Sequence, residues 1–303
     1  MSERKDVRFL AEFDAKKGEL PEGVALDGDR IYVGMTPTRQ VFRLTQGGGY
    51  ELFASLPQME PGKGLMTGMF VGPAHELYVN LVSTDPSVPG GVYRVPAGGG
   101  AGVLFATDPS MVFPNDLKFD ADGSLFMTDS SAGAIWKITP EGQASLWLHH
   151  PLLAGDHTRC FPDQGGFDTG SNGIVLGLDG AVYIANSDQA TLVRISRTAR
   201  GEAGEPEIVA GPDCAALNGA DGLVQDRDGT FYTVAHRSNT VVKIVLGKPL
   251  QILAEGTPLD FPASIALKRD SEGFRAIITN FAIETGMTHP DRARPGVVSL
   301  GLD

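Results

Sequence analysis

One pattern recurs six times along this chain of 303 residues and limits the folds that it can adopt. Its clearest copy is FPNDLKFDADGSLFMTDS at residues 113–130, in which two alternating apolar runs flank the turn sequence Asp-Ala-Asp-Gly. This pattern predicts two antiparallel strands joined by a tight turn. Close copies lie at residues 170–187 and 219–236, a shorter copy begins at Pro21, and degenerate copies begin at Leu65 and Phe261.

The spacing of these hairpins predicts a β-propeller. Two further strand-like runs follow most of the hairpins, and repeats of about 40–50 residues with four strands each are typical of propeller blades. One polar or small residue marks the start of each hairpin, and we call these six places the ring positions. The shortest spacing is 42 residues and the longest is 57. The ring positions are Glu22, Thr67, Asn115, Asn172, Asp221 and Ala263.

The two ends of the chain predict how the ring closes. The sixth repeat has only three strand-like runs, the last of them GVVSLGL at residues 296–302. The run VRFLAEF at residues 7–13 precedes the first repeat and belongs to none. Pairing of these two runs would complete the sixth blade and remove an exposed sheet edge. We therefore expect an all-β fold, a single six-bladed propeller domain over residues 1–303, closed by the N-terminal strand.

The ring positions also predict a metal site, because the first strand of every blade lines the central tunnel and the six side chains then meet at one mouth. Glu22, Asn115, Asn172 and Asp221 offer two carboxylates and two amide oxygens, which suit a hard cation. Turn chemistry is the alternative, since Asn-Gly and Asp-Gly pairs are common in turns. The shared register favours the metal, and we expect one divalent ion, Ca²⁺ before Mg²⁺, Mn²⁺ or Zn²⁺.

Composition and charge limit the kinds of molecule that the protein is expected to bind. A formal net charge of −12 argues against nucleic acid, whose phosphates require a basic surface, so a small-molecule substrate is expected and the oligomeric state stays open. No apolar run of signal-peptide or membrane-spanning length occurs, so we expect a cytoplasmic protein without membrane contact. Cys160 and Cys214 form no Cys-x-x-Cys motif, and we expect free thiols, although both lie in loops that could face each other.

The quoted motifs also carry a resemblance that covers nearly the whole chain. PEGVAL, FPNDLKFDADGSLFMTDS, SNGIVLGLDG and GADGLVQDRDGTFY resemble the gluconolactonase and senescence-marker-protein family of six-bladed propeller hydrolases, which includes diisopropyl fluorophosphatase. The resemblance implies that Glu22, Asn172 and Asp221 hold a divalent metal. It also implies that Asn115 contacts the metal, or its water and substrate, and that Asp221 serves as the catalytic base.

One residue departs from the family pattern. Sugar-acid lactonases of the family often carry Arg two residues before the Asn of the third blade, where it contacts the polyol. This chain has Phe113 there, and a phenyl ring cannot donate the hydrogen bonds of a guanidinium. We therefore expect Phe113 to contact a less polar substrate. Further apolar side chains are expected near the same mouth, at Met66, Met69, Phe167, Phe281 and Met287.

Together these observations predict a metal-dependent hydrolase, most simply a lactonase. The metal would polarise a carbonyl group, and Asp221 would take a proton from the attacking water. Asn115 would orient substrate or water. Asp116 would brace Asn115 or the entry of the strand, or it would accept a backbone hydrogen bond in a turn. His236 would contact the substrate, assist proton transfer or make an ordinary hydrogen bond. Two alternatives stay open: another electrophile, such as an epoxide, an organophosphate or a biosynthetic intermediate, and a propeller that only binds a partner.

Overall fold

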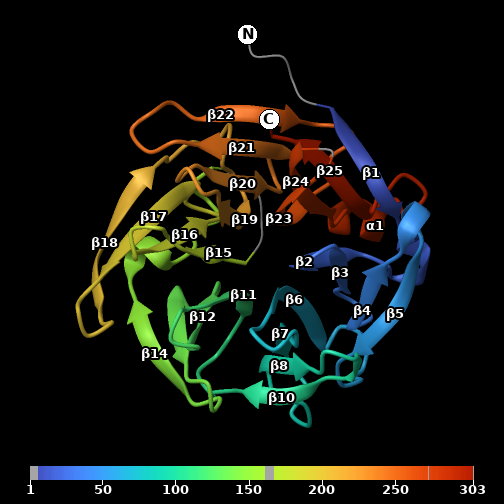
Figure 1. The fold of residues 1–303 in the computed structure, drawn as a ribbon, viewed down its shortest axis with the longest axis horizontal. Coiled ribbons are helices and arrows are strands. Elements are labelled where there is room, and N and C mark those ends of the chain that lie inside the picture. The colour runs from blue at the N-terminus through green and yellow to red at the C-terminus, as the bar shows by residue number, and fades with distance from the viewer. Residues whose placement is uncertain (1–5, 161–166, 272, 303) are drawn as a thin grey trace.

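Six small sheets surround one axis in the computed structural model, which describes residues 6–160, 167–271 and 273–302 (Figure 1). Each sheet has four antiparallel strands, and the first sheet gains a fifth, parallel strand. The chain runs once around the axis, from the blue first blade to the red sixth blade (Figure 1). The predicted all-β, six-bladed propeller is confirmed.

The two strands of each predicted hairpin are the two nearest the axis. The inner strands are β2 (Pro21–Asp27), β6 (Gly64–Val71), β11 (Pro114–Phe119), β15 (Ser171–Leu176), β19 (Ala220–Gln225) and β23 (Pro262–Asp270). The second strands are β3 (Arg30–Met35), β7 (Leu77–Ser83), β12 (Leu125–Asp129), β16 (Val182–Asn186), β20 (Phe231–Ala235) and β24 (Gly273–Asn280).

Two further strands complete each blade on its outer side. The third strands are β4 (Gln40–Leu44), β8 (Gly91–Val95), β13 (Ala134–Ile138), β17 (Thr191–Arg197), β21 (Thr240–Ile244) and β25 (Gly296–Gly301). The outermost strands are β5 (Tyr50–Ser55), β10 (Val103–Ala106), β14 (Ala144–His149), β18 (Ala203–Ala210), β22 (Gln251–Glu255) and β1 (Val7–Glu12).

Asp-Gly turns join the first two strands of the third, fourth and fifth blades, as the sequence predicts. Gly123, Gly180 and Gly229 have φ angles of 83°, 80° and 84°, a left-handed conformation that residues with a Cβ rarely adopt. In the third blade the backbone N–H of Ser124 donates to Asp122 Oδ1 at 2.8 Å. Both residues of the turn thus have a defined role, glycine in the backbone bend and aspartate in capping it.

The N-terminal strand closes the ring. β1 pairs with β25 in antiparallel register, from Val7 opposite Leu300 to Glu12 opposite Gly296. Because β25 continues through β24 to β23, the outermost strand of the sixth blade comes from the opposite end of the chain. The predicted closure is therefore confirmed. It holds the six inner strands around one axis, and this arrangement brings residues from different blades together.

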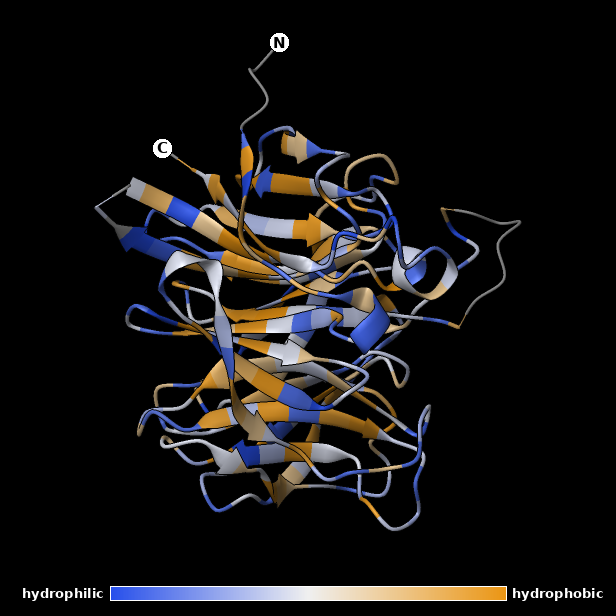
Figure 2. Cartoon of the chain, turned by 90° about the vertical axis from the view of Figure 1, so that its right-hand side faces the viewer, coloured by the Kyte–Doolittle hydropathy of each residue, from blue (hydrophilic) through white to orange (hydrophobic). Residues whose placement is uncertain are grey.

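The hydrophobic core lies between neighbouring blades. Six clusters of buried side chains each join two adjacent blades around the ring. Between the fourth and fifth blades, for example, Tyr183 packs on Phe231 with ring centroids 4.5 Å apart. Hydrophobic segments alternate with hydrophilic ones along the strands (Figure 2). Every blade therefore depends on both neighbours for burial of its faces.

A few short elements lie in the connections. The helix α1 (Ile283–Thr288) precedes β25, and β9 (Gly100–Ala101) pairs in parallel with β5. No helix in the described ranges combines the length and the apolar character that a membrane crossing requires. Short 3-10 helices span Ala15–Lys17, Gln46–Gly48 and Pro151–Leu153.

The expectation of free thiols is wrong, because Cys160 and Cys214 form a disulfide. Cys160 lies in the connection before β15 and Cys214 in the connection before β19, so the bond ties the fourth blade to the fifth. The two residues are 54 positions apart in sequence, and they meet because the ring places these two connections side by side. Disulfides persist mainly in oxidising compartments, so the cytoplasmic location stays a prediction that this bond does not support.

Candidate metal centre

Every inner strand carries a bulge at its ring position. In the third blade Pro114 pairs with Asp129 and Leu117 pairs with Met127, so β11 has one more residue than β12 over this stretch. The same shift occurs in the other five blades. A bulge takes residues out of the ladder and redirects their side chains. The displaced pairs are Glu22-Gly23, Thr67-Gly68, Asn115-Asp116, Asn172-Gly173, Asp221-Gly222 and Ala263-Ser264.

Close packing of the blades explains the glycine at the second position of most bulges. A Cβ on Gly173 would lie 2.2 Å from the backbone oxygen of Asp221, and one on Gly222 would lie 2.9 Å from that of Ala263. Real Cβ atoms do not approach backbone so closely, and a side chain would push the blades apart. The Asn-Gly and Asp-Gly pairs here therefore serve inter-blade packing, and they are distinct from the hairpin turns.

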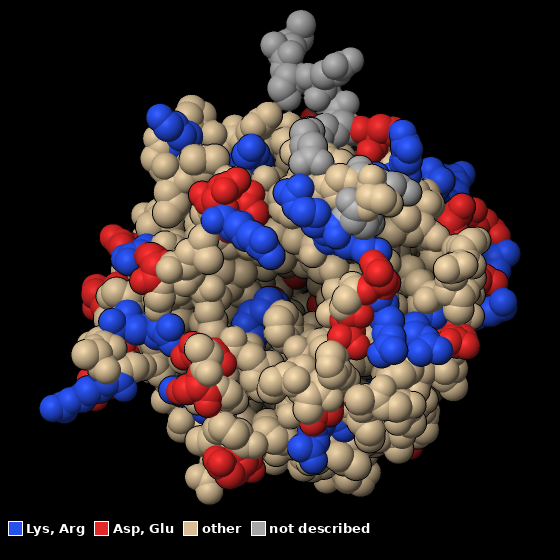
Figure 3. All heavy atoms as spheres, viewed as in Figure 1, with Lys and Arg blue, Asp and Glu red and all other residues tan. Residues whose placement is uncertain are grey.

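Asp116 takes the place of this glycine in the third blade. Its Oδ2 accepts the backbone N–H of Ile174 in the fourth blade at 3.1 Å, and its Oδ1 accepts that of Leu117 at 2.8 Å. Lys118 Nζ lies 3.0 Å from the same Oδ2. Asp116 therefore braces the entry of its strand, as one of its predicted roles has it, and its backbone bonds go to strands of two blades rather than to a turn. Figure 3 shows charged side chains of both signs in the hollow at the axis.

Two serine hydroxyls fix the orientation of the ring amides. Asn115 Nδ2 donates to Ser130 Oγ at 2.8 Å, and Asn172 Nδ2 donates to Ser187 Oγ at 3.0 Å. Each serine Oγ in turn donates to a backbone carbonyl of the next blade at 2.7 Å. Because the hydroxyl proton is committed there, the serine oxygen must accept from the amide nitrogen. The amide oxygens are thereby left for another partner, and Asn172 Oδ1 is buried with none among the described residues.

Glu22 and Asp221 are buried acids that repel each other. Glu22 is 6% exposed and Asp221 is 8% exposed. Burial raises the pKa of Glu22 well above its ordinary value, and the charges of Asp221 and Asp116 raise it further. Burial and the charge of Asp116 also raise the pKa of Asp221, partly offset by the Asn172 side chain and the Gly222 N–H. A cation held between these acids would relieve both effects.

The donor set fits a hard divalent cation. Within the described ranges, no three His, Cys, Asp or Glu side chains form a metal-binding group by themselves, so an ion here needs amide oxygens too. Glu22 Oε2 and Asn172 Oδ1 are buried oxygens without a hydrogen-bond partner among these residues. Carboxylate and amide oxygens are ligands that Ca²⁺ prefers. The other ring positions contribute little, since Thr67 donates its hydroxyl to Pro114 O at 2.8 Å and Ala263 has no donor atom.

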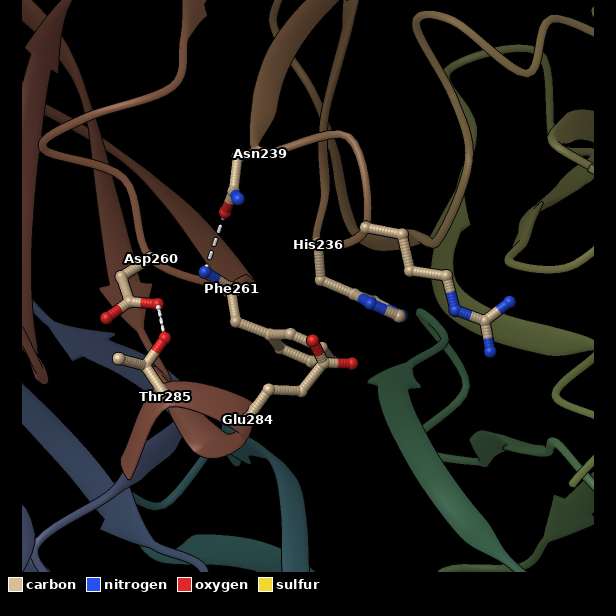
Figure 4. Close-up of a pocket in the computed structure, with 7 residues that line it drawn as sticks. His236, Asn239, Asp260, Phe261, Glu284 and Thr285 are labelled. Atoms are coloured by element: carbon tan, nitrogen blue, oxygen red, sulfur yellow. Dashed lines mark hydrogen bonds between the residues drawn. The ribbon is translucent and has the colours of Figure 1, made fainter. Parts of the chain in front are cut away.

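His236 lies beside the ring, at the register position that Ser130 and Ser187 occupy in their blades. Its ring stacks on Phe261, with centroids 4.2 Å apart and planes at 21° (Figure 4). Burial, and then the charge of Arg237, lower the pKa of His236 to about 3. The imidazole is therefore neutral at neutral pH. Its Nδ1 is buried without a partner among the described residues.

A pocket of about 190 Å³ opens at His236, between the fifth and sixth blades (Figure 4). The end of β20, the start of β23 and the helix α1 surround it, and we call it the His236 pocket. Phe281 packs edge-on against the Phe261 wall, with centroids 5.9 Å apart. The lining residues are His236, Arg237, Asn239, Asp260, Phe261, Glu284 and Thr285.

The apolar residues predicted at the mouth fall into two groups. Met66 and Met69 are buried in the core between the first and second blades, so their placement at the mouth is wrong. Phe113 and Phe167 stack with ring centroids 5.8 Å apart, and Phe167 is 63% exposed. Met287 is exposed on α1. Phe113 and Phe167 thus form an aromatic pair that joins the connections before β11 and β15.

Sequence reasoning missed several residues that shape this region. Ser130 and Ser187 were detectable, because FMTDS, YIANS and YTVAH end at the same register and extend the repeat by one residue. Glu284 and the ion pair between Arg237 and Asp188 had no such signal. These three residues lie in connections between strands. Because the connections differ in length from blade to blade, aligning the repeats does not bring equivalent positions together.

No protein-family model and no curated protein sequence matches the chain. Several solved structures do. The calcium-binding protein regucalcin from Agrobacterium tumefaciens is 18% identical, with a TM-score of 0.68 over 98% of this chain and 94% of that one. A gluconolactonase from Xanthomonas campestris is 16% identical, with a TM-score of 0.67 over 98% and 89%. A virginiamycin B lyase from Staphylococcus aureus is 15% identical, with a TM-score of 0.59 over 91% and 82%.

These similarities concern the fold. A gluconolactonase, a calcium-binding protein and a lyase all resemble this chain in structure, so the fold by itself does not determine a reaction. The chain has the six-bladed propeller architecture that gluconolactonase and regucalcin also have.

Proposed function

We propose that this protein is a divalent-metal-dependent hydrolase that opens a lactone or a closely related ester. One observation carries the proposal. Two acids on different blades, Glu22 and Asp221, are buried near enough for the charge of Asp221 to raise the pKa of Glu22. Proteins rarely bury two uncompensated carboxylates together without a cation or a functional need. The similarity to a gluconolactonase and to a calcium-binding protein supports the same reading.

Glu22, Asn115, Asn172 and Asp221 would hold the ion. Ca²⁺ is favoured over Mg²⁺, Mn²⁺ and Zn²⁺, because all four donors are oxygens and two of them are neutral amides. When bound, the ion supplies Lewis acidity towards a carbonyl oxygen and a counter-charge for the oxyanion that develops there. The serine bonds to both amides would keep their oxygens available to it.

The remaining steps belong to residues of the chain. Asp221 would take the proton of the attacking water at a carboxylate oxygen, and burial, which raises its pKa, favours proton acceptance. Asn115 would orient the substrate or the water. The Phe113 and Phe167 rings would form an apolar wall that limits access of other water molecules. His236 would offer a neutral ring nitrogen to the substrate rather than an acidic proton.

A panel of lactones and esters tests this proposal. The protein is assayed after chelation, and then with Ca²⁺, Mg²⁺, Mn²⁺ or Zn²⁺ restored. We expect turnover to vanish with chelator and to return best with Ca²⁺. Asp221→Asn should lower kcat by about 10²–10⁴-fold with the fold intact, the usual contribution of a general base. Asp228→Asn, in an exposed hairpin turn, is the matched control. Activity that ignores both the chelator and Asp221→Asn would refute the proposal.

A further inference from the structure

We propose that the His236 pocket binds a cationic nitrogen, so that the substrate is a lactone or ester that carries an ammonium group. That the substrate is a lactone or ester rests on the proposed function. That the pocket binds a cation is argued from the contacts of the pocket alone. Three features support it: a carboxylate without a partner, a wall of stacked rings and a buried polar atom without a partner.

Glu284 is a carboxylate without a counter-ion. It stands in the first turn of α1 and is exposed towards the pocket that His236 and Phe261 line. Its side chain has no hydrogen-bond or ion-pair partner in the described part of the chain. Figure 4 shows its carboxylate extending from α1 into the same space as the Phe261 ring. A carboxylate in this position attracts a cation and repels an anion.

The other charged residues of the pocket do not cancel this charge. Arg237 is already paired, because its Nη1 lies 2.9 Å from Oδ1 of Asp188, an acid with no exposed surface. Asp260 lines the pocket as a second acid, although its oxygens accept the hydroxyl of Thr285 at 2.8 Å and a backbone N–H at 3.0 Å. The pocket is therefore negative overall, which disfavours a carboxylate or phosphate on the ligand.

The wall of the pocket suits a cation for a second reason. The rings of His236 and Phe261 are stacked, and an aromatic face attracts an ammonium group through its quadrupole. Phe261 is held in place, since its backbone N–H donates to Asn239 Oδ1 at 2.7 Å (Figure 4). A neutral imidazole adds no positive charge that would repel an ammonium group. His236 is 8% exposed, and its buried Nδ1 has no partner among the described residues.

The position of the pocket links the cation to the reacting bond. His236 directly follows Ala235, which pairs with Ala220, the neighbour of Asp221. A substituent at the His236 pocket would therefore lie close to the ring positions. This proximity favours a nitrogen one or two bonds from the lactone ring, as in an α-amino lactone, over a remote one.

Direct binding tests the pocket without any catalysis. Benzylammonium and neutral benzyl alcohol are titrated calorimetrically into chelated protein. We expect benzylammonium to bind at least about tenfold more tightly, and Glu284→Gln to remove this preference. Glu141→Gln, an exposed acid in a hairpin turn of the third blade, should leave it unchanged. Equal binding of the two probes, or a preference that survives Glu284→Gln, would overturn the proposal.

Enzymatic turnover of two lactones provides a second test of the proposal. With Ca²⁺ present, α-amino-γ-butyrolactone is compared with α-hydroxy-γ-butyrolactone at a pH where the amine is protonated. We expect kcat/KM to favour the amino lactone about tenfold, Glu284→Gln to abolish this ratio, and Glu141→Gln to leave the ratio unchanged. If neither lactone is hydrolysed but the binding preference holds, the proposed function fails and the cation pocket stands. If both react equally, the cation pocket fails and the hydrolase stands.

Discussion

Lys118 and Asp116 form an ion pair inside the tunnel, with Lys118 Nζ 3.1 Å from Oδ1 and 3.0 Å from Oδ2 of the carboxylate. Their side chains are only 17% and 14% exposed. Asp116 in turn raises the pKa of Glu22 and of Asp221, so the pair is coupled electrostatically to the candidate metal centre. Lys118 therefore moderates the negative charge that the two acids experience.

Lys118→Met should destabilise the metal-free protein and strengthen Ca²⁺ binding. Loss of the lysine leaves a poorly solvated charge, and we expect a decrease of ~1–3 kcal/mol in the free energy of unfolding, below the cost for a fully buried pair. The added negative potential should favour the cation. Urea unfolding with chelator and with Ca²⁺ measures both effects. In an Asp116→Asn background Lys118→Met should have little effect, and an equal loss there would contradict the explanation.

Ser187→Ala should weaken metal binding. The serine holds the Asn172 amide so that its oxygen stays available, and loss of such a supporting bond typically costs about 10–100-fold in metal affinity. Calorimetric titration with Ca²⁺ gives the affinity. Ser124→Ala, at a buried serine next to the hairpin turn of the third blade, is the control. Unchanged affinity in Ser187→Ala would show that the amide is not a ligand.

Chelated protein should lose stability as the pH rises. Burial raises the pKa values of Glu22 and Asp221 in the folded state, and the charge of Asp116 raises both further, so the folded chain keeps protons that the unfolded chain releases. The contribution of these two acids to stability is therefore greatest below the ordinary carboxyl range, and it falls as they ionise. Saturating Ca²⁺ should remove this fall and release protons on binding. Scanning calorimetry across the acidic to neutral range measures it, and Glu22→Gln should flatten the chelated profile.

His236 should make the protein acid-sensitive. Its pKa is depressed from 6.5 to about 3, so the unfolded chain takes up this proton before the folded chain does. Stability then falls as the pH drops from about 6.5 towards 3, by of the order of 4 kcal/mol for this one group. His236→Phe, which keeps the stack on Phe261, should reduce this loss, and the exposed His149→Phe should not. A pH dependence identical in all three proteins would rule out buried His236 as the cause.

The fold could be predicted because each hairpin has a local sequence pattern and because this pattern recurs along the chain. Each hairpin has its own alternation, and the third, fourth and fifth also have an Asp-Gly turn, so several copies support one architecture. The closure by residues 7–13 followed from counting strands. The ring positions Glu22, Asn172 and Asp221 were recognisable because the repeat aligns them, and all three occupy the same place in a bulge.

The details that shape the site are not local, and they escaped prediction for that reason. The disulfide joins two connections 54 residues apart, which only the closed ring brings together. The His236 pocket combines the end of β20 with α1, an insertion that no other blade has in the described chain. Met66 and Met69 look like mouth residues in the sequence, but they face the neighbouring blade. The packing of one blade against the next determines the positions of these residues, and the sequence of a single repeat carries no information about that packing.

Direct titration of the metal-free protein with Ca²⁺ is the most incisive measurement. We expect one ion per chain, with binding weakened at least about a hundredfold in Glu22→Gln and in Asp221→Asn, since each change removes a charged ligand from a shared site. Asp228→Asn should bind as the unaltered protein does. Absence of saturable binding, or binding that neither Glu22→Gln nor Asp221→Asn affects, would contradict a metal centre assembled from separate blades.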